Sequence, residues 1–280
     1  MSPTPSTDPL DCEIVVTRSG ALAVRDKTTG ELMHPVVGPL IEAEQLYVVP
    51  SRLAERLREN VKEPLVLLDV GLGAGSNAIA AIRVSEAMRA GRRLEVVSFD
   101  HSLAALVLAA RPDHAAAFGL DGVTAEAARA LIERGSHESE HTRWRLVLGD
   151  LLPCLADQAA AIADVVFWDP FSPRANPALW TMTAFTALRR LCRARATVHT
   201  YSAATAVRSA LLLAGFAVGV GEPTKNDRQT TIAAVDASDL SRPLDRRWLD
   251  RLTRSSAPFP TDAPTDALAR IAAMPQFGSR

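Results

Sequence analysis

The sequence of 280 residues holds few cysteines and no long apolar run. Its three cysteines, Cys12, Cys154 and Cys192, are unclustered, which excludes a disulfide framework and a zinc site and favours reduced thiols in a cytoplasmic protein. The six histidines show no metal-ligand spacing, so we expect no metal. The apolar runs are too short or too interrupted to span a membrane, so we expect no membrane partner.

A strong charge of either sign is also missing, since the formal net charge is −1. Non-specific binding to nucleic acid depends on many phosphate contacts and usually accompanies a basic composition. The basic side chains, almost all of them arginine, instead form local clusters at Arg189–Arg195 and Arg242–Arg254. Composition alone therefore leaves contact with a nucleic acid undecided.

The most informative stretch is LVLLDVGLGAGSN, residues 65–77. Its aliphatic start predicts a strand buried on both faces of a parallel sheet. A helix is expected over Ala78–Arg89, with Ser76 as its cap and an amide end that favours negative charge. The turn between them has three glycines, which let a bulky ligand approach the backbone. These are Gly71, Gly73 and Gly75. The combination is typical of a nucleotide-type cofactor site.

The spacing of the glycines argues against the two commonest sites of this kind. A P-loop needs a lysine straight after its last glycine, whereas Ser76 and Asn77 follow Gly75. A dinucleotide fingerprint reads G-x-G-x-x-G, whereas this turn reads G-L-G-A-G, with Asp69 two residues before it. The D-x-G-x-G-x-G form resembles the first motif of class I methyltransferases that use S-adenosylmethionine. The resemblance implies that the glycines, Asp69 and Asn77 bind the cofactor.

Two further acidic residues end the next apolar strands. Asp100 closes the strand Leu94–Asp100, where a carboxylate can accept hydrogen bonds from both ribose hydroxyls. Asp150 follows the strand Trp144–Gly149, where similar methyltransferases place an Asp against the adenine amino group. Each acid alone is explained as a solvated strand end. Acids at the ends of three successive strands indicate a cofactor site.

The fourth apolar strand, Ala163–Trp168, leads into the loop that we expect to carry the chemistry. Asp169 leaves this strand, and Pro170 and Pro173 stiffen the loop that follows. Methyl transfer from a sulfonium to an amine is an in-line displacement, to which an enzyme contributes mainly positioning. The Asp169 carboxylate can accept an amine N–H and stabilise the developing ammonium. Asp169 is therefore the predicted catalytic residue, with a helix cap or loop acid as the alternative.

The loop DPFSPRANPALWT, residues 169–181, resembles the D-x-F-x-P-x-x-N-P-x-x-W motif of the MnmC-type methyltransferase domain. Pro170 departs from the family, which usually has Gly or Ala there. The resemblance extends over about Gly30 to Ala234. Further segments that match in order are Gly30–Pro35, Glu42–Glu44, Thr200–Phe216 and Lys225–Arg228.

This family methylates an aminomethyl nitrogen on the wobble uridine of certain tRNAs. The resemblance implies S-adenosylmethionine as cofactor, tRNA as partner, and a separate flavin-dependent oxidase that acts on the same nucleoside. It also assigns residues to the substrate. Phe171 and Trp180 are expected to line the uridine pocket, and the expected phosphate contacts are Arg208, Lys225 and Arg228.

Two other functions remain compatible with the sequence. A polyamine-synthase-like aminopropyltransferase, or a methyltransferase of small amines, would use the same fold with a different acceptor. A non-catalytic relative would keep the fold as a binding or regulatory module. The four acids at strand ends argue against that second possibility, because an inactive site has no evident reason to keep them. They are Asp69, Asp100, Asp150 and Asp169.

The predicted fold class is α/β, with a Rossmann-like class I methyltransferase sheet, a final antiparallel strand pair and an N-terminal β-hairpin. The strand pair is expected at Phe216–Gly221 and Arg228–Val235, and the polar run Ser136–Thr142 is expected to be a loop. The expected divisions are a disordered tail (1–12), the hairpin with a helix (13–60), the methyltransferase core (61–236) and a C-terminal extension (237–280).

Overall fold

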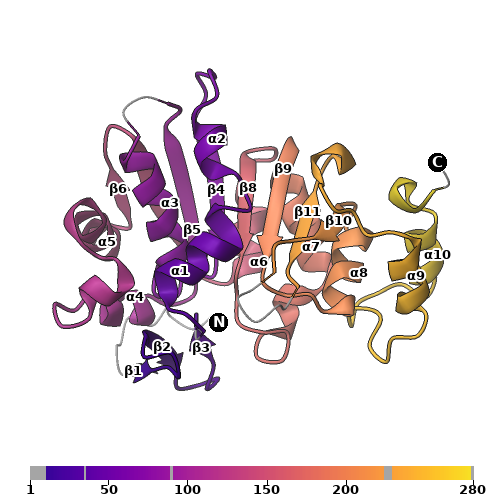
Figure 1. The fold of residues 1–280 in the computed structure, drawn as a ribbon, viewed down its shortest axis with the longest axis horizontal. Helices are drawn as coiled ribbons and strands as arrows, with labels where there is room; N and C mark the ends of the chain where they lie inside the picture. The colour runs from indigo at the N-terminus through magenta and orange to yellow at the C-terminus, as the bar shows by residue number, and fades with distance from the viewer. Residues whose placement is uncertain (1–10, 35, 89–90, 224–228, 279–280) are drawn as a thin grey trace.

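The computed structural model describes residues 11–34, 36–88, 91–223 and 229–278. Its centre is an eight-stranded sheet with helices on both faces, and a small three-stranded sheet lies beside one edge of the helical layer (Figure 1). The strand order of the large sheet is β10-β11-β9-β8-β4-β5-β7-β6. Five central strands run parallel. They are β4 (Leu65–Val70), β5 (Leu94–Asp100), β7 (Thr142–Leu148), β8 (Ala163–Trp168) and β9 (Cys192–Thr200).

The chain reverses its direction of travel across the sheet between β4 and β8. It first moves outward from β4 to β5 and β7, and then returns to add β8 and β9 on the other side of β4. Ligands of open α/β sheets bind outside the carboxyl ends of the strands at such a switch point. The loops after β4 and β8 therefore lie where a ligand is expected.

Antiparallel strands complete both edges of the sheet. β11 (Thr231–Ala234) pairs with β9 and with β10 (Ala217–Val220), which confirms the predicted closing pair. At the opposite edge, the polar run expected to be a loop instead contains β6 (Ser136–Glu138), paired with β7. An edge strand with one free side carries polar side chains as readily as a loop does, so composition did not separate the two.

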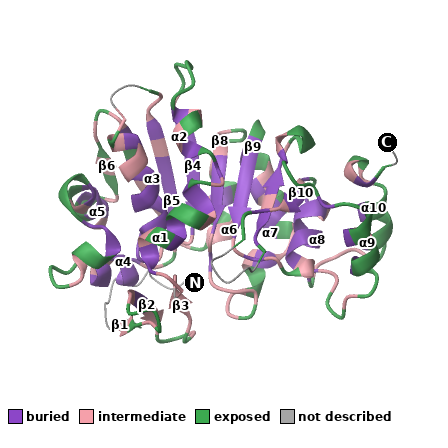
Figure 2. Ribbon diagram, viewed as in Figure 1, coloured by how far each residue is buried: buried purple, intermediate pink, exposed green. Residues whose placement is uncertain are grey.

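The alternating side chains of β4 explain why both faces carry helices. Leu65 and Leu67 belong to one apolar core, whereas Val66 and Leu68 belong to the other, because successive strand residues point to opposite faces. All six residues of β4 are buried, as its position in the middle of Figure 2 shows. The predicted doubly buried strand is therefore confirmed.

Different helices cover the two faces. The first core includes residues from α3 (Ser76–Glu86), α4 (Ala104–Ala109) and α5 (Gly122–Arg134). The second includes residues from α6 (Leu151–Ala156), α7 (Met182–Leu191) and α8 (Thr205–Leu213). In the parts of the chain that the structure describes, no helix is long and apolar enough to cross a membrane.

The N-terminal segment forms the small sheet and a broken helix. The expected hairpin is confirmed as β1 (Cys12–Val16) and β2 (Leu22–Asp26), to which β3 (Leu32–Met33) adds. The helical part is divided into three short segments. It consists of α1 (Pro39–Ala43), a π-helical turn (Glu44–Val48) and α2 (Leu53–Leu57). This arrangement sets the side chains of residues 31–34 and of Tyr47 against the carboxyl edge of the large sheet.

The residues after Asp236 pack onto the second core. This segment contains two short helices, α9 (Arg246–Leu252) and α10 (Ala267–Ala272). Trp248 and Phe277 stack with ring centroids 6.0 Å apart, and both are buried in the second core. The last described segment therefore supplies apolar side chains to the same core as α7 and α8.

Candidate active site

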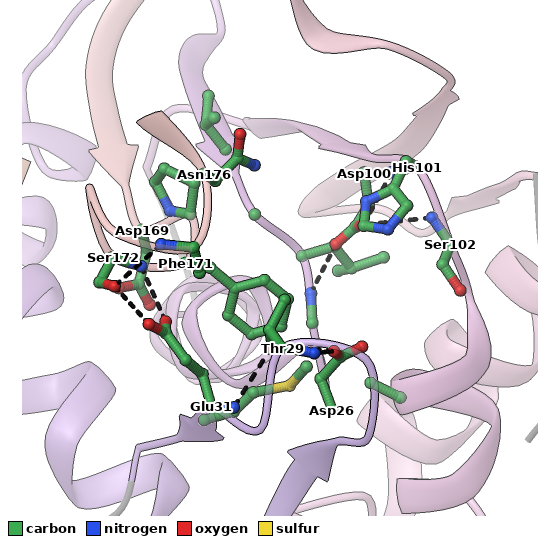
Figure 3. A pocket seen from close by; sticks show the side chains of 18 of the residues that line it. Asp26, Thr29, Glu31, Asp100, His101, Ser102, Asp169, Phe171, Ser172 and Asn176 are labelled. Carbon is green, nitrogen blue, oxygen red and sulfur yellow. Dashed lines mark hydrogen bonds and ion pairs between the residues drawn. The ribbon is translucent and has the colours of Figure 1, made fainter. Parts of the chain in front are cut away.

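A cavity of about 1140 Å³ lies between the N-terminal hairpin and the carboxyl edge of the large sheet. Its volume slightly exceeds the range for sites that enclose small molecules, about 300–1,000 Å³. Residues from the ends of β4, β5, β7 and β8 line one side, and the β2–β3 turn lines the other (Figure 3). Six of the predicted site residues line it, namely Gly71, Gly73, Asp100, Asp150, Asp169 and Phe171.

Two glycines of the turn occupy positions where a side chain would clash with neighbouring atoms. Gly71 has φ +88°, and a Cβ there would lie 2.6 Å from the carbonyl oxygen of Asp169. Gly73 has φ +51°, and its Cβ would lie 3.0 Å from the sulfur of Met33. Glycine tolerates this backbone conformation and this close approach, whereas other residues do not. The two glycines therefore let the turn pack closely against the loop after β8 and against Met33, and they line the cavity with backbone atoms.

Asp100 is held at the cavity by backbone donors. The Gly73 N–H donates to one carboxylate oxygen at 2.9 Å, and the His101 N–H donates to the other at 2.7 Å. His101 Nδ1 also lies 3.2 Å from Asp100, and this contact raises the pKa of that histidine. The Ser102 N–H also donates to Oδ1 at 3.2 Å, whereas Oδ2 accepts, among the described residues, only the Gly73 N–H and keeps an acceptor position for a ribose hydroxyl. Asp150 lines the same cavity one strand further out.

Side chains from three different segments contact the Asp169 carboxylate. The Tyr47 hydroxyl donates to its Oδ1 at 2.6 Å, and the Asn77 amide donates to its Oδ2 at 2.7 Å. His34 Nε2 lies 3.2 Å from the same Oδ2. The backbone N–H of Asp169 is also bound, to the carbonyl of Val70 at 2.8 Å. Groups from four separate segments therefore fix the direction of this carboxylate.

Burial and the Asp169 charge change the acidity of these neighbours. Burial raises the pKa of the Tyr47 hydroxyl well above its usual value, and Asp169 raises it further. Burial lowers the pKa of His34, but Asp169, Glu42 and Asn77 oppose this effect and leave the pKa above its usual 6.5. Tyr47 therefore stays protonated and donates a hydrogen bond at neutral pH, whereas His34 binds a proton more tightly than an ordinary imidazole.

The loop after β8 is tied to the N-terminal hairpin across the cavity mouth. Both oxygens of Glu31 accept hydrogen bonds from Ser172, one from its backbone N–H at 2.8 Å and one from its hydroxyl (Figure 3). On the inner side, the Tyr201 hydroxyl donates to the carbonyl of Pro170 at 3.1 Å. Phe171 lies between these two contacts and lines the cavity. The loop therefore presents Asp169 and Phe171 together.

The structure does not bring every predicted residue to the cavity wall. Asp69 is fully buried behind the turn, where the Ser98 hydroxyl donates to it at 2.7 Å. Burial raises the pKa of Asp69 to about 7, against the effect of Ser98. Asn77 contacts Asp169, and Gly75 packs against Leu106 behind the turn. None of these three predicted residues lines the cavity.

Two predicted substrate residues are also interior. Trp180 is 4% exposed and donates from its indole nitrogen to the Phe171 carbonyl at 2.8 Å, so it supports the loop from below. Arg208 is 4% exposed, and its guanidinium donates to Thr231 Oγ1 and to the Thr230 carbonyl. The sequence did not reveal that these two positions are buried. Lys225 and Arg228 lie outside the described residues.

Sequence reasoning missed several residues that complete the site. His34 and Tyr47 contact Asp169, and Glu31 holds Ser172. Glu31 and His34 lie in the segment Gly30–Pro35, whose resemblance to the MnmC family assigned them no role, and Tyr47 lies outside every segment that carried the resemblance. Among the described residues, no group of three or more His, Cys, Asp or Glu could hold a metal ion.

Comparisons with known proteins agree with this geometry. Residues 124–236 match a family described as S-adenosyl-L-methionine-dependent methyltransferase. The tRNA 5-methylaminomethyl-2-thiouridine biosynthesis bifunctional protein MnmC of Pseudomonas aeruginosa is 34% identical over 193 residues, which are 64% of this chain and 28% of that protein. The protein of the same name from Methylibium petroleiphilum is 29% identical over 231 residues, 78% of this chain and 34% of that protein. The chain thus spans about a third of these relatives.

A solved structure covers more of the chain. The crystal structure of MnmC2 from Aquifex aeolicus matches with a TM-score of 0.72 and 26% sequence identity, over 93% of this chain and 82% of that one. The match therefore includes the N-terminal segment and most of the residues after the sheet, in addition to the sheet itself.

The parallel sheet with its closing antiparallel pair, and the cavity at its switch point, define a class I methyltransferase that depends on S-adenosylmethionine. Within that class, the chain is similar to the MnmC-type methyltransferase domains in sequence and in structure. These findings confirm the fold class, the cofactor and the family resemblance that the sequence predicted.

Proposed function

We propose that this chain methylates the aminomethyl nitrogen on the wobble uridine of tRNA, converting 5-aminomethyl to 5-methylaminomethyl-(2-thio)uridine. The names of the MnmC relatives support this substrate. The observation that carries the proposal is the Asp169 carboxylate, fixed by Tyr47 and Asn77 at the wall of the cofactor cavity. A fixed carboxylate at this place suits an acceptor that is an amine.

Four residues are proposed to hold the cofactor, which supplies a methyl group on a sulfonium. Gly71 and Gly73 leave room for its methionine part beside the backbone. Asp100 accepts hydrogen bonds from the ribose hydroxyls, and Asp150 accepts one from the adenine amino group. The Asp100 carboxylate is already oriented by the Gly73 N–H, so the turn and the ribose site form one unit.

Asp169 is proposed to position the acceptor amine. Its carboxylate accepts an N–H of the amine, which turns the nitrogen lone pair toward the methyl carbon, and then stabilises the ammonium product. Tyr47 and Asn77 supply hydrogen bonds to both carboxylate oxygens, so the group needs little reorganisation during the reaction. This is catalysis by positioning and charge.

The nucleoside is proposed to enter past Phe171, which projects from the β8 loop into the cavity mouth toward the turn at Thr29 (Figure 3). Trp180 supports the Phe171 backbone and does not touch the base. Lys225 and Arg228 remain proposed phosphate contacts. A separate flavin-dependent oxidase acting on the same nucleoside, in the cytoplasm, completes the proposal.

The test is methylation of tRNA from a strain that lacks this chain, followed by mass spectrometry of its nucleosides. We expect the purified protein and S-adenosylmethionine to convert 5-aminomethyl-(2-thio)uridine into its methylated form. Calorimetric titrations with S-adenosylmethionine and with its decarboxylated form serve as the control. Tight binding of the decarboxylated form, with transfer to a small free amine, would overturn the proposal in favour of an aminopropyltransferase.

A further inference from the structure

We propose that His34 accepts, on Nε2, the proton that the substrate ammonium must lose before methyl transfer. The inference rests on the proposed function, because it concerns an amine acceptor held at Asp169. A primary alkylamine is mostly protonated at neutral pH, and the protonated nitrogen has no lone pair with which to attack. The cavity therefore needs a proton acceptor close to Asp169.

The geometry places an unoccupied nitrogen there. His34 Nε2 lies 3.2 Å from Asp169 Oδ2, is buried, and makes no hydrogen bond within the described part of the chain. Tyr47 and Asn77 are hydrogen-bond donors to Asp169, so neither takes up a proton from the amine in the arrangement seen here. His34 lines the cavity beside Asp169. An amine that donates to Asp169 is thus brought next to Nε2.

The backbone holds His34 in an unusual conformation for this purpose. His34 has φ +53°, which is uncommon for a residue other than glycine and often marks a functional position. The segment after it is clamped by Glu42, whose Oε1 accepts hydrogen bonds from the backbone N–H groups of Val36 and Val37 at 2.5 and 2.7 Å. Glu42 is 7% exposed, so this clamp is inside the protein.

The charges that face His34 favour a proton on it. Asp169 at the end of β8 and Glu42 on α1 are both negative, while Asn77 on α3 and Tyr47 in the π-helical turn are neutral. Together Asp169 and Glu42 overcome the effect of burial and raise the pKa of His34 above 6.5. His34 in turn lowers the pKa of Asp69, which is buried behind the glycine turn. The raised pKa makes His34 Nε2 a stronger proton acceptor than the nitrogen of an ordinary imidazole.

The proton transfer balances without any further reagent. The ammonium N–H bond breaks, its electron pair stays on the amine nitrogen, and the proton bonds to His34 Nε2. The imidazolium then pairs with Asp169 Oδ2 while the amine nitrogen forms its bond to the methyl carbon and the carbon–sulfur bond breaks toward sulfur. The imidazolium releases its proton to solvent through the cavity before the next turnover.

The test compares the pH profiles of kcat/KM for the wild-type protein and H34Q on tRNA that carries 5-aminomethyluridine. At pH 7, we expect H34Q to be slower by about 10²-fold, the lower end for loss of a general base. Its rate is expected to rise tenfold per pH unit as free neutral amine accumulates, so the defect shrinks below about tenfold near pH 9. A defect of equal size at every pH would overturn the proposal and leave His34 a positioning residue.

H114Q is the matched control. His114 Nε2 lies 3.4 Å from Asp113, which gives a similar pair of side chains away from the cavity, so its profile is expected to equal that of the wild-type protein. A wild-type protein that binds S-adenosylmethionine but leaves the tRNA unmethylated would overturn the proposed function and this inference with it. If the wild-type protein is active and H34Q shows the same pH profile, only the inference is overturned.

A titration of the wild-type protein keeps the proposal testable if H34Q does not fold. The His34 imidazole is followed by NMR with labelled histidine, in the wild-type protein and in D169N. We expect a pKa above 6.5 that falls in D169N, because the carboxylate next to Nε2 has lost its charge. A wild-type pKa at or below 6.5 would overturn the proposal.

Discussion

The Tyr47 hydroxyl donates a 2.6 Å hydrogen bond to Asp169 Oδ1, although 122 residues separate the two in the sequence. The Tyr47 ring packs against Phe167 of β8, with ring centroids 5.3 Å apart, so the same side chain also contacts the strand that carries Asp169. The N-terminal segment is therefore part of the active site as well as its cover.

Tyr47→Phe tests this relationship. The ring keeps its packing, but the partly buried Asp169 carboxylate loses a donor, which is worth about 1.5–3 kcal/mol for a bond to a charged group. We expect kcat to fall about tenfold or more, with unchanged affinity for S-adenosylmethionine in calorimetry. Tyr201→Phe is the matched variant, because it loses a bond to the uncharged Pro170 carbonyl. Equal kcat values for Tyr47→Phe and the wild-type protein would contradict the assigned role.

Asp169→Asn tests the positioning carboxylate itself. The variant keeps the shape and one acceptor oxygen but loses the charge that stabilises the ammonium product. We expect cofactor affinity to stay nearly constant and methyl transfer to slow by about 10²–10³-fold, as for other preorganised electrostatic groups. Asp100→Asn provides the contrast, since it is expected to weaken cofactor binding first. A wild-type rate in Asp169→Asn would make Asp169 a structural loop residue.

Gly73→Val tests the proposed cofactor site at the glycine turn. The added side chain would stand in the space beside the backbone at φ +51°, within 3.0 Å of Met33. We expect S-adenosylmethionine affinity to fall at least about tenfold in a protein that remains folded by circular dichroism. Gly20→Val is the control, because Gly20 has φ +82° in a hairpin turn but no neighbour within 4 Å. Unchanged affinity in a folded Gly73→Val protein would remove this assignment.

Asp69 predicts a pH dependence of stability. Its pKa is about 7 in the folded protein, against an ordinary 3.8. Below pH 4 the carboxyl is protonated in both states. Between pH 4 and 7 the unfolded chain releases its proton first, so the stability that the neutral carboxyl contributes falls as the pH rises and is lost above about 7. The full span corresponds to about 4 kcal/mol.

Urea unfolding of Asp69→Asn and the wild-type protein at pH 4.5 and 7.5 measures this effect. The asparagine stays neutral at every pH. We therefore expect the unfolding free energy of the variant to increase relative to that of the wild-type protein as the pH rises. Asp113→Asn is the control, because the Asp113 side chain is 73% exposed. A difference between Asp69→Asn and the wild-type protein that does not change with pH would show that Asp69 ionises normally.

Local patterns in the sequence determined the sheet and the ends of its strands. β5 and β8 have the bounds predicted from their apolar runs, and Asp100 and Asp169 stand at their carboxyl ends. A strand buried on both faces must be almost wholly apolar, and a polar residue or glycine must end it, so both features are visible in the sequence. The closing strand pair and the hairpin turns followed from equally local signals.

Only the tertiary structure decided which side chains meet. Trp180 and Arg208 were predicted to contact the substrate, but the packing of α7 and α8 on the second core makes them interior. Asn77 follows the glycine turn in the sequence and yet reaches across to Asp169. Its partners His34 and Tyr47 lie at least 122 positions before Asp169 in the sequence, in a segment that packs over the sheet edge. Apolar periodicity records which face a residue buries, whereas a polar contact depends on how distant segments are packed together.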